Sequence, residues 1–423
     1  MAHFAIFAPP LRGHYDPLSA LAEALIARGH RATFVHHEDA RQLVQAEGAG
    51  FVPIGAGRPS VANWTRPMAK IRGLIGLGGT MKRMEDFTAT FCREGPALLR
   101  SIGVDAIIAD QLEPAGGLVA DYLKIPWISI ATTIPMNREM GVPPPFVSWR
   151  YDPSAPGIRR NEGGWMVSDF ILRSFNRAIA RNSKALGLSR RGRLEDCFSP
   201  LLQLAQAVPG LDFPRKELPP TFHYTGPFRP DDDPPLSLPP GDGRPTVLAS
   251  LGTLQGSRTA IFRKVAEACD RLGLRLVITL GGLKGAKEAG SLPGRPIVFD
   301  WLPQRSALGQ VDLVVCHGGM NIVLDTLAAG LPMLVLPLAF EQPGIAARVA
   351  RSGAGKVLRR GTSPASLARE LADIALDPSF RARAMALSDQ IAAAGGRARA
   401  ADLIEAALGA SARSAGPTRA REA

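Results

Sequence analysis

Short apolar runs alternate along this chain with stretches in which apolar residues recur every three or four positions. The first run, HFAIFA, is followed by PPLRGHYD, which we expect to be a loop, and then by apolar residues at helical spacing from Leu18 to Ile26. Asp16 suits the N-cap of that helix and Pro17 its first position, and Gly29 suits its end. HRATFVHH predicts the next strand, so the chain opens with a strand–helix–strand unit of a parallel α/β sheet.

The same alternation of predicted strands and helices continues in two series, which a linker separates. VDAIIAD and IPWISIA predict strands near 104–110 and 125–131, with EPAGGLVADYL as the helix between them. FRPDDDPPLSLPPGDGRP is dense in Pro, Asp and Gly and predicts a linker. After it, TVLAS, LRLVITL, PIVFD, VDLVVC and PMLVLP predict a second series of strands separated by helices. We therefore expect an N-terminal α/β domain (1–227), a linker (228–245), a C-terminal α/β domain (246–410) whose last helix packs back on the first domain, and a disordered tail (411–423).

The region from about 55 to 85 is less regular than its surroundings. It mixes apolar side chains such as Trp64 and Ile71 with basic ones such as Arg66 and Lys82. Three interpretations stay open: part of an apolar pocket, a surface that rests on a membrane, or a loop and helix that pack on their own domain.

Composition narrows the class of protein. The chain has 423 residues, 46% of them hydrophobic, which suffices for two full-sized cores. It contains no apolar run of about 18 residues, and MAHFAIFAPP has no basic n-region, so we expect a cytoplasmic chain without a spanning helix. The four cysteines are scattered and favour reduced thiols over a zinc site, so we expect no metal.

The net charge of +12 admits three kinds of partner: nucleic acid, anionic lipid or an anionic small substrate. No basic run is interleaved with aromatic residues, which argues against nucleic acid. A basic surface without a specific partner also remains open.

Four loops follow strands of the second half, where ligands bind in open parallel sheets. They read ASLGTLQGS, DWLPQ, HGGMN and LAFEQPG, and one pocket could collect all four. In HGGMN, Gly318 and Gly319 let a phosphate approach the backbone, and the helix that follows offers free N–H groups. His317 and Asn321 can add donors to a diphosphate, and Asp325 can accept from ribose hydroxyls. The alternative is that the two glycines only form a tight turn.

Two residues of the first half suit acid–base chemistry. His14 lies between the first strand and helix, and Asp110 ends the strand IIAD. A histidine backed by a carboxylate can act as a general base. Neither first strand of the two halves leads into G-x-G-x-x-G and there is no Walker A motif, which argues against a nicotinamide oxidoreductase.

From Trp301 to Gln342 the motifs WLPQ, HGGMNIVLD and PLAFEQ resemble the nucleotide-sugar signature of the UDP-sugar-dependent GT-B glycosyltransferases, the family that contains the plant and antibiotic glycosyltransferases. Within that family the chain looks most similar to the bacterial zeaxanthin glucosyltransferases, with FAPP, DQLEPAG, PMNRE, CFSPL, LDFPR, ASLGTLQGSR, HGGMN and PLAFEQPG spread over both halves. The resemblance implies two Rossmann-like parallel-sheet domains that face each other across a cleft.

The resemblance also implies roles for residues in the cleft. His14 would be the base and Asp110 its partner. The UDP-sugar would be bound by Thr253, Trp301, Gln304, His317, Gly318, Gly319, Asn321, Asp325, Glu341 and Gln342. The acceptor would be bound by Pro10, Met136, Pro143 and Phe146. Asp325 stands where Glu is commoner in the family, and Glu341 stands where Asp is common.

The implied reaction is an inverting, metal-independent transfer of glucose from UDP-glucose to the hydroxyls of a lipophilic carotenoid, giving a β-glucoside and a diglucoside. UDP-glucose is then a substrate, and no cofactor is expected. The basic charge could hold the enzyme against the anionic inner face of the membrane. The alternatives are another lipophilic acceptor (sterol, macrolide or flavonoid), a UDP-sugar epimerase and a non-catalytic nucleotide-sugar-binding protein.

Overall fold

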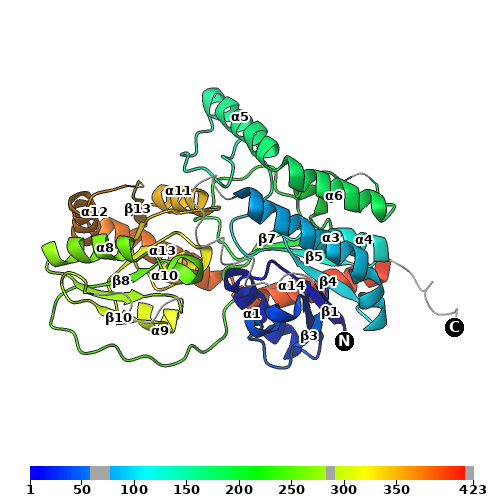
Figure 1. Cartoon of the computed structure of the whole chain (residues 1–423), viewed down its shortest axis with the longest axis horizontal. Coiled ribbons are helices and arrows are strands. Elements are labelled where there is room, and N and C mark those ends of the chain that lie inside the picture. The colour runs from blue at the N-terminus through cyan, green and yellow to red at the C-terminus, as the bar shows by residue number, and fades with distance from the viewer. Residues whose placement is uncertain (58–76, 190, 283–290, 360, 415–423) are drawn as a thin grey trace.

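The computed structural model describes residues 1–57, 77–189, 191–282, 291–359 and 361–414. Its described residues form two parallel α/β sheets that lie side by side (Figure 1). The N-terminal sheet has seven strands in the order β3-β2-β1-β4-β5-β6-β7. In chain order they are β1 (His3–Phe7), β2 (Arg31–His36), β3 (Gly50–Pro53), β4 (Ala106–Asp110), β5 (Trp127–Ala131), β6 (Leu202–Ala205) and β7 (Phe222–Tyr224).

Helices cover this sheet because each strand must cross over to reach its parallel neighbour. They are α1 (Arg12–Ile26), the 3-10 helix η1 (Glu38–Leu43), α3 (Leu77–Ser101), α4 (Ala115–Leu123), α5 (Ala155–Ile171), α6 (Arg173–Ala185) and the 3-10 helix η2 (Glu195–Cys197). Residues 58–76, which hold most of the irregular segment noted above, lie outside the described residues, and residues 77–85 of that segment form the start of α3.

The C-terminal sheet has six parallel strands in the order β10-β9-β8-β11-β12-β13. They are β8 (Thr246–Ser250), β9 (Arg275–Thr279), β10 (Ile297–Phe299), β11 (Leu313–Cys316), β12 (Met333–Val335) and β13 (Gly355–Val357). The helices are α7 (Gly252–Gln255), α8 (Thr259–Arg271), α9 (Gln304–Leu308), α10 (Met320–Ala328), α11 (Gln342–Ser352), α12 (Pro364–Leu376), α13 (Pro378–Ala393) and α14 (Gly396–Ser414). The prediction of two parallel α/β halves is confirmed.

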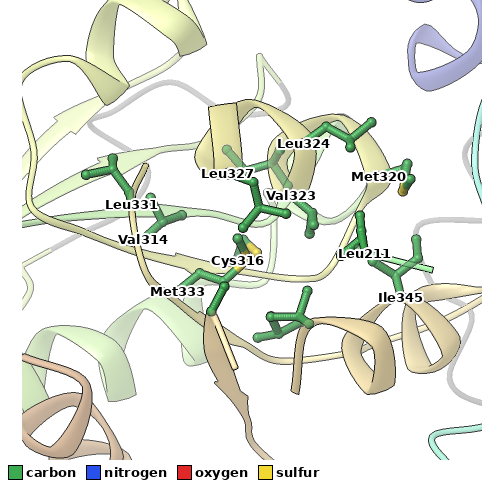
Figure 2. Packing of buried hydrophobic residues seen from close by; sticks show 14 of the residues in the cluster. Leu211, Val314, Cys316, Met320, Val323, Leu324, Leu327, Leu331, Met333 and Ile345 are labelled. Atoms are coloured by element: carbon green, nitrogen blue, oxygen red, sulfur yellow. The ribbon is translucent and has the colours of Figure 1, made fainter. Parts of the chain in front are cut away.

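One buried cluster joins the two halves. Figure 2 shows the side chains of α10, among them Val323 and Leu327, packed around Cys316 and Met333 of the C-terminal sheet. Leu211, from the N-terminal half, lies in the same cluster beside Ile345 of α11. The contact surface between the halves is therefore partly a continuous hydrophobic core.

The last helix returns to the N-terminal half. Ala400 and Ile404 of α14 are fully buried in the cluster under β1 and α1, and Arg28 reaches Asp402 and Glu405 at 2.6 and 2.8 Å. Figure 1 shows α14 lying against the N-terminal half. Because α14 extends to Ser414, it includes the start of the segment expected to be a tail.

The first helix differs from the sequence-based expectation. It begins at Arg12, after the extended residue Leu11, so Asp16 is not its N-cap and Pro17 lies inside it. His14 consequently lies in the first turn of a helix and not in a loop. The pattern missed this start because Arg12 and Gly13 are exposed and carry no apolar signal.

Four strands were not predicted: β3, β6, β7 and β13. Each has only three or four residues and includes a glycine or a polar residue that interrupts the apolar run, namely Gly50, Gln203, His223 or Lys356. The equally short β10 and β12 are wholly apolar and were predicted.

Candidate active site

Each sheet has one crossover point, and the hydrogen bond from Asn321 to Gly13 joins the loops at these two points. In the N-terminal sheet the chain winds outward in both directions from the neighbouring pair β1 and β4, and in the C-terminal sheet from β8 and β11. Ligands in doubly wound sheets bind at such points, beyond the carboxyl ends of the strands. The candidate site lies between them.

His14 and Asp110 meet at the first of these points. Nδ1 of His14 lies 2.9 Å from Oδ2 of Asp110. Asp110 ends β4, and its Oδ1 accepts a hydrogen bond of 2.8 Å from the backbone N–H of Leu112. Because the carboxylate fixes the proton on Nδ1, Nε2 is the nitrogen that can take a proton from a substrate.

Thr132, just beyond the end of β5, completes this group. Its hydroxyl donates to Asp110 Oδ2 and lies 2.8 Å from His14 Nδ1. Thr132 was not among the predicted site residues, although the run IPWISIA predicts a strand, and in the structure the end of that strand adjoins Asp110.

Charge from both halves acts on His14. Burial alone would lower the pKa of His14, but the carboxylates of Asp110 and Glu341 outweigh it and hold that pKa above its usual value. Burial in turn raises the pKa of Glu341 above its usual value, against the opposing effect of His14. Glu341 follows β12 of the C-terminal half, so the two halves jointly determine the charge on His14.

His317 lies at the second crossover point, between two glycines. A Cβ atom at Gly252 would come within 2.7 Å of its ring, and one at Gly319 within 2.5 Å. Gly252 also has a φ of +70°. Burial lowers the pKa of His317 to about 4, so its imidazole is neutral at pH 7. It can donate a hydrogen bond to a phosphate but brings no full charge.

Gly318 allows the close packing of this turn. Its φ is +82°, and a Cβ there would lie 2.8 Å from Val335. The next residue, Gly319, is the N-cap of α10 and has no side-chain cap. The first N–H groups of α10 are thus available to a ligand, as the sequence predicts.

Asn321, in the first turn of α10, reaches the other half. Its Nδ2 donates to the carbonyl oxygen of Gly13 at 3.2 Å, next to His14. Its Oδ1 lies 3.4 Å from Nε2 of Gln206. Asn321 therefore joins the predicted diphosphate site to the His14–Asp110 pair.

Asp325 lies one turn further along α10 and accepts two strong hydrogen bonds. Gln304 Nε2 donates to Oδ2 at 2.6 Å, so two residues predicted to bind the UDP-sugar are in contact. Arg229 Nε donates to Oδ1, also at 2.6 Å. Trp301 is 57% exposed, so its ring is free to stack on a base.

Arg229 was missed because it lies in the linker, far from the motifs in sequence. It follows β7 and also donates to Gln206 Oε1 at 3.1 Å, and its Nη2 lies 3.3 Å from Asn321 Oδ1. One cation of the N-terminal side thus touches two predicted donor-binding residues, Asn321 and Asp325. Arg229 and Asp325 also line a cavity of about 330 Å³ together with Pro227, Arg305, Leu308, Ala328, Ala329 and Ile391.

The remaining predicted donor residues lie at the same edge of the C-terminal sheet. Thr253 is partly exposed in the short helix α7. Gln342 is buried, and its Oε1 accepts 2.8 Å hydrogen bonds from the backbone N–H groups of Leu338 and Ala339. Its amide oxygen therefore holds the loop after β12, which leaves the NH₂ group for a ligand.

The predicted acceptor residues are spread over different environments. Phe146 is exposed, Pro10 and Pro143 are buried, and Met136 lies in the hydrophobic cluster that joins the halves. A further apolar group spans the cleft, and of its members only Met84 lies in the segment 55–85 that the sequence left open as part of an apolar pocket. It consists of Leu11, Met84, Phe87, Leu254, Ala339 and Phe340.

Within the residues that the structure describes, no group of three or more His, Cys, Asp and Glu side chains could hold a metal ion. Among the helices so described, none is both long and apolar enough to cross a membrane.

Comparison with known proteins identifies the family. The family model of UDP-glucoronosyl and UDP-glucosyl transferase matches residues 63–392. Over 412 residues the chain is 37% identical to a zeaxanthin glucosyltransferase of Pantoea ananas, covering 96% of each chain. It is 39% identical over 412 residues to a zeaxanthin glucosyltransferase of Pseudescherichia vulneris, covering 96% of this chain and 98% of that one.

Solved structures give the same result for the fold. The crystal structure of the glycotransferase of kitacinnamycin matches with a TM-score of 0.75 and 26% identity, over 96% of this chain and 99% of that one. The two parallel-sheet halves are those of the GT-B fold. The chain belongs to the UDP-glucoronosyl and UDP-glucosyl transferase family and is a glycosyltransferase.

Proposed function

We propose that this enzyme transfers glucose from UDP-glucose to the hydroxyl groups of a carotenoid diol, zeaxanthin or a close analogue, with inversion at the anomeric carbon. The observation that carries the proposal is the His14–Asp110 pair, at 2.9 Å, in contact with the half that carries the nucleotide-sugar motifs. The choice of acceptor is supported by relatives that share 37% and 39% identity over nearly the whole chain.

In the proposed mechanism, Nε2 of His14 takes the proton of the acceptor hydroxyl. The acceptor oxygen forms a bond to the anomeric carbon while the bond from that carbon to the β-phosphate oxygen breaks, and UDP leaves. Attack from the opposite face converts the α-linked donor into a β-glucoside. Asp110 stabilises the imidazolium that forms, and His14 then releases the proton to solvent.

The developing charge on UDP is met by groups of the C-terminal half and by Arg229. The N–H groups at the start of α10 and the neutral His317 can donate to the diphosphate. Arg229 lies within 3.4 Å of the backbone oxygen of Asn321, so its positive charge is next to the same helix start. We propose that this set acts without a divalent metal.

A carotenoid acceptor needs an apolar path to His14 with few polar groups. Leu11 and Met84 of the N-terminal half and Leu254 and Phe340 of the C-terminal half form such a surface at the cleft. An acceptor with a hydroxyl at each end could react twice, which would give the diglucoside.

The test is UDP release from UDP-glucose with zeaxanthin in detergent micelles, with EDTA present, followed by product mass and anomeric configuration. One or two added hexoses in β linkage support the proposal. His14→Ala should lower kcat by about 10²- to 10⁴-fold while UDP affinity stays close to that of the wild type.

Other outcomes of this test point elsewhere. UDP release only with a sterol, macrolide or flavonoid would keep the transferase and replace the acceptor. Consumption of UDP-glucose without any acceptor, and without UDP release, would indicate an epimerase. Activity that EDTA abolishes and Mg²⁺ restores would overturn metal independence.

A further inference from the structure

Helix α5 exposes a ridge of large apolar side chains. Met166, Val167 and Phe170 are 73%, 59% and 66% exposed. Figure 1 shows α5 projecting from the molecule, away from both sheets. Single exposed apolar residues are common in proteins, but three within five positions form a patch that needs a partner.

The opposite face of α5 is already used for packing. Trp165 Nε1 donates to the carbonyl oxygen of Val142 at 3.2 Å, and Asn161 Nδ2 donates to that of Met140 at 3.2 Å. A Cβ at Gly164 would come within 2.6 Å of the Trp149 ring. Because this face is fixed to the 138–149 loop, the helix cannot turn its ridge inward.

Cationic side chains surround the ridge. Residues 155–185, which span α5 and α6, contain six Arg or Lys and two Asp or Glu. Arg173 lies with its guanidinium 4.2 Å from the centre of the Phe170 ring. Arg159, Arg177 and Arg181 are exposed, and they continue the three- to four-residue spacing of the ridge along the helices.

We infer that the ridge of Met166, Val167 and Phe170 inserts into the interface of an anionic lipid bilayer while the surrounding arginines contact lipid phosphates. Apolar side chains on one face of a helix, flanked by cations, are the arrangement that binds such a surface without crossing it. The net charge of +12 has the sign that an anionic surface attracts.

A second copy of the chain suits this face less well. A twofold contact through the ridge would place Arg159, Arg173 and Arg177 of one copy against the same cations of the other. Stable protein interfaces also involve about 20–30 residues per side, and this ridge offers three large apolar side chains.

The position of the ridge connects it to the active site, and this step rests on the proposed function. The loop under α5 includes Pro143 and Phe146, two of the predicted acceptor residues. Docking of α5 would therefore hold that loop at the bilayer, where a carotenoid is dissolved. The acceptor could then enter the cleft without passing through water.

The test is sedimentation of the full chain with phosphatidylcholine vesicles and with the same vesicles containing phosphatidylglycerol. The wild type should bind the anionic vesicles, and added salt should weaken the binding. The triple variant Met166→Ser/Val167→Ser/Phe170→Ser should lose about 10-fold or more in affinity, as expected when apolar insertion is lost. Arg173→Gln/Arg177→Gln should reduce binding to anionic vesicles only.

A matched control is available on the C-terminal half. Leu376→Ser/Met385→Ser removes two apolar side chains that are 82% and 56% exposed, and it should bind vesicles as the wild type does. Thermal denaturation checks that all variants fold. A wild type that stays in the supernatant, or a triple variant that sediments like the wild type, would overturn the inference. A dimer in solution that the triple variant abolishes would overturn it in favour of a second copy.

Measurements of glucosylation activity distinguish a failure of membrane docking from a failure of the proposed function. The triple variant should match the wild type with zeaxanthin in detergent micelles and fall behind it with zeaxanthin in anionic vesicles. If the wild type binds vesicles but glucosylates no carotenoid in either form, the acceptor assignment fails and membrane docking stands.

Discussion

The carbonyl oxygen of Gly13 accepts a hydrogen bond from Nδ2 of Asn321, 3.2 Å away in the other half of the protein. That oxygen is free for the contact because residue 17, whose N–H would bond to it in a regular helix, is a proline inside α1. Pro17 thus leaves an acceptor open beside His14, at a cost to helix stability.

Replacing Pro17 by Ala should reverse both effects. The new N–H competes with Asn321 for the Gly13 oxygen, so kcat/KM should fall about 2- to 10-fold, the range of one neutral hydrogen bond. The melting temperature should rise, since proline inside a helix costs about 3 kcal/mol relative to Ala. Steady-state kinetics and thermal denaturation measure the two effects.

A double-mutant cycle shows whether Asn321 carries this effect. In an Asn321→Ala background, Pro17→Ala should leave kcat/KM unchanged. An equal loss in both backgrounds would mean that the proline acts through the shape of α1 alone.

The pH profile of the reaction should report His14. The base must be neutral, so kcat/KM should rise with pH through the pKa of His14, which Asp110 and Glu341 hold above its usual value against the effect of burial. In Asp110→Asn the main charge that raises the pKa of His14 is gone, while burial still lowers that pKa. The inflection of kcat/KM should therefore move to lower pH. The value of kcat/KM at high pH should also fall, because no carboxylate accepts the hydrogen bond from Nδ1 and fixes the proton there.

Asp16 supplies the control, since burial raises its pKa to about 6 and it lies in the same helix as His14. Asp16→Asn should retain the inflection. If the inflection disappears in Asp16→Asn and persists in Asp110→Asn, the titrating group is Asp16 and not His14.

Arg229 should contribute to donor binding through Asp325. Arg229→Met keeps most of the side-chain volume but removes a charged hydrogen bond, worth about 1.5–3 kcal/mol. The dissociation constant of UDP should rise by about 10-fold or more. Isothermal titration calorimetry with UDP and 2′-deoxy-UDP gives the readout, and the loss should be smaller for the deoxy nucleotide if Asp325 binds the ribose.

Arg305→Met is the matched control, because Arg305 lines the same cavity and pairs instead with Asp233, at 3.8 Å. It should bind UDP as the wild type does. Equal losses in both arginine variants would show a general effect of charge in the cavity, not a specific effect on Asp325.

The sequence predicted the features that short local patterns encode, namely strands, helices and the motifs at strand ends. Strand-end motifs such as HGGMN carry their own glycines and helix start, so His317 and Asn321 could be placed from the pattern alone. Asp110 followed from the end of an apolar run. The pairing of His14 with Asp110 was also accessible, because neighbouring parallel strands bring their carboxyl ends together.

Residues that act through long-range contacts could not be found in this way. Arg229 has no motif, and it meets Asp325 only because the linker crosses between the halves. The exposed ridge on α5 has the same helical spacing as a buried face, and only the packing of the 138–149 loop decides which face is outside. Asp212 and Arg348 are 136 positions apart, and no local pattern connects them.

Arg348 of α11 and Asp212 of the N-terminal half form a buried ion pair between the halves. Arg348 Nε donates to Asp212 Oδ1 at 2.6 Å, and both side chains are almost fully buried. Burial would raise the pKa of Asp212, but Arg348 and Arg215 outweigh it and lower that pKa to about 2. The carboxylate thus stabilises the folded protein above its ordinary pKa, and this stabilisation is lost as the pH falls towards 2.

Asp212→Asn should therefore lower the melting temperature at neutral pH, since breaking a buried pair costs about 3–5 kcal/mol. The difference from the wild type should shrink as the pH falls below about 4. Asp212→Asn/Arg348→Met should lose less than the sum of the single changes, because it leaves no unpaired Arg348 cation. Activity should fall as well, since α11 begins directly after Glu341 and its displacement moves that carboxylate away from His14. Additive losses, or a difference that does not depend on pH, would show that the two residues stabilise the protein by packing and not as an ion pair.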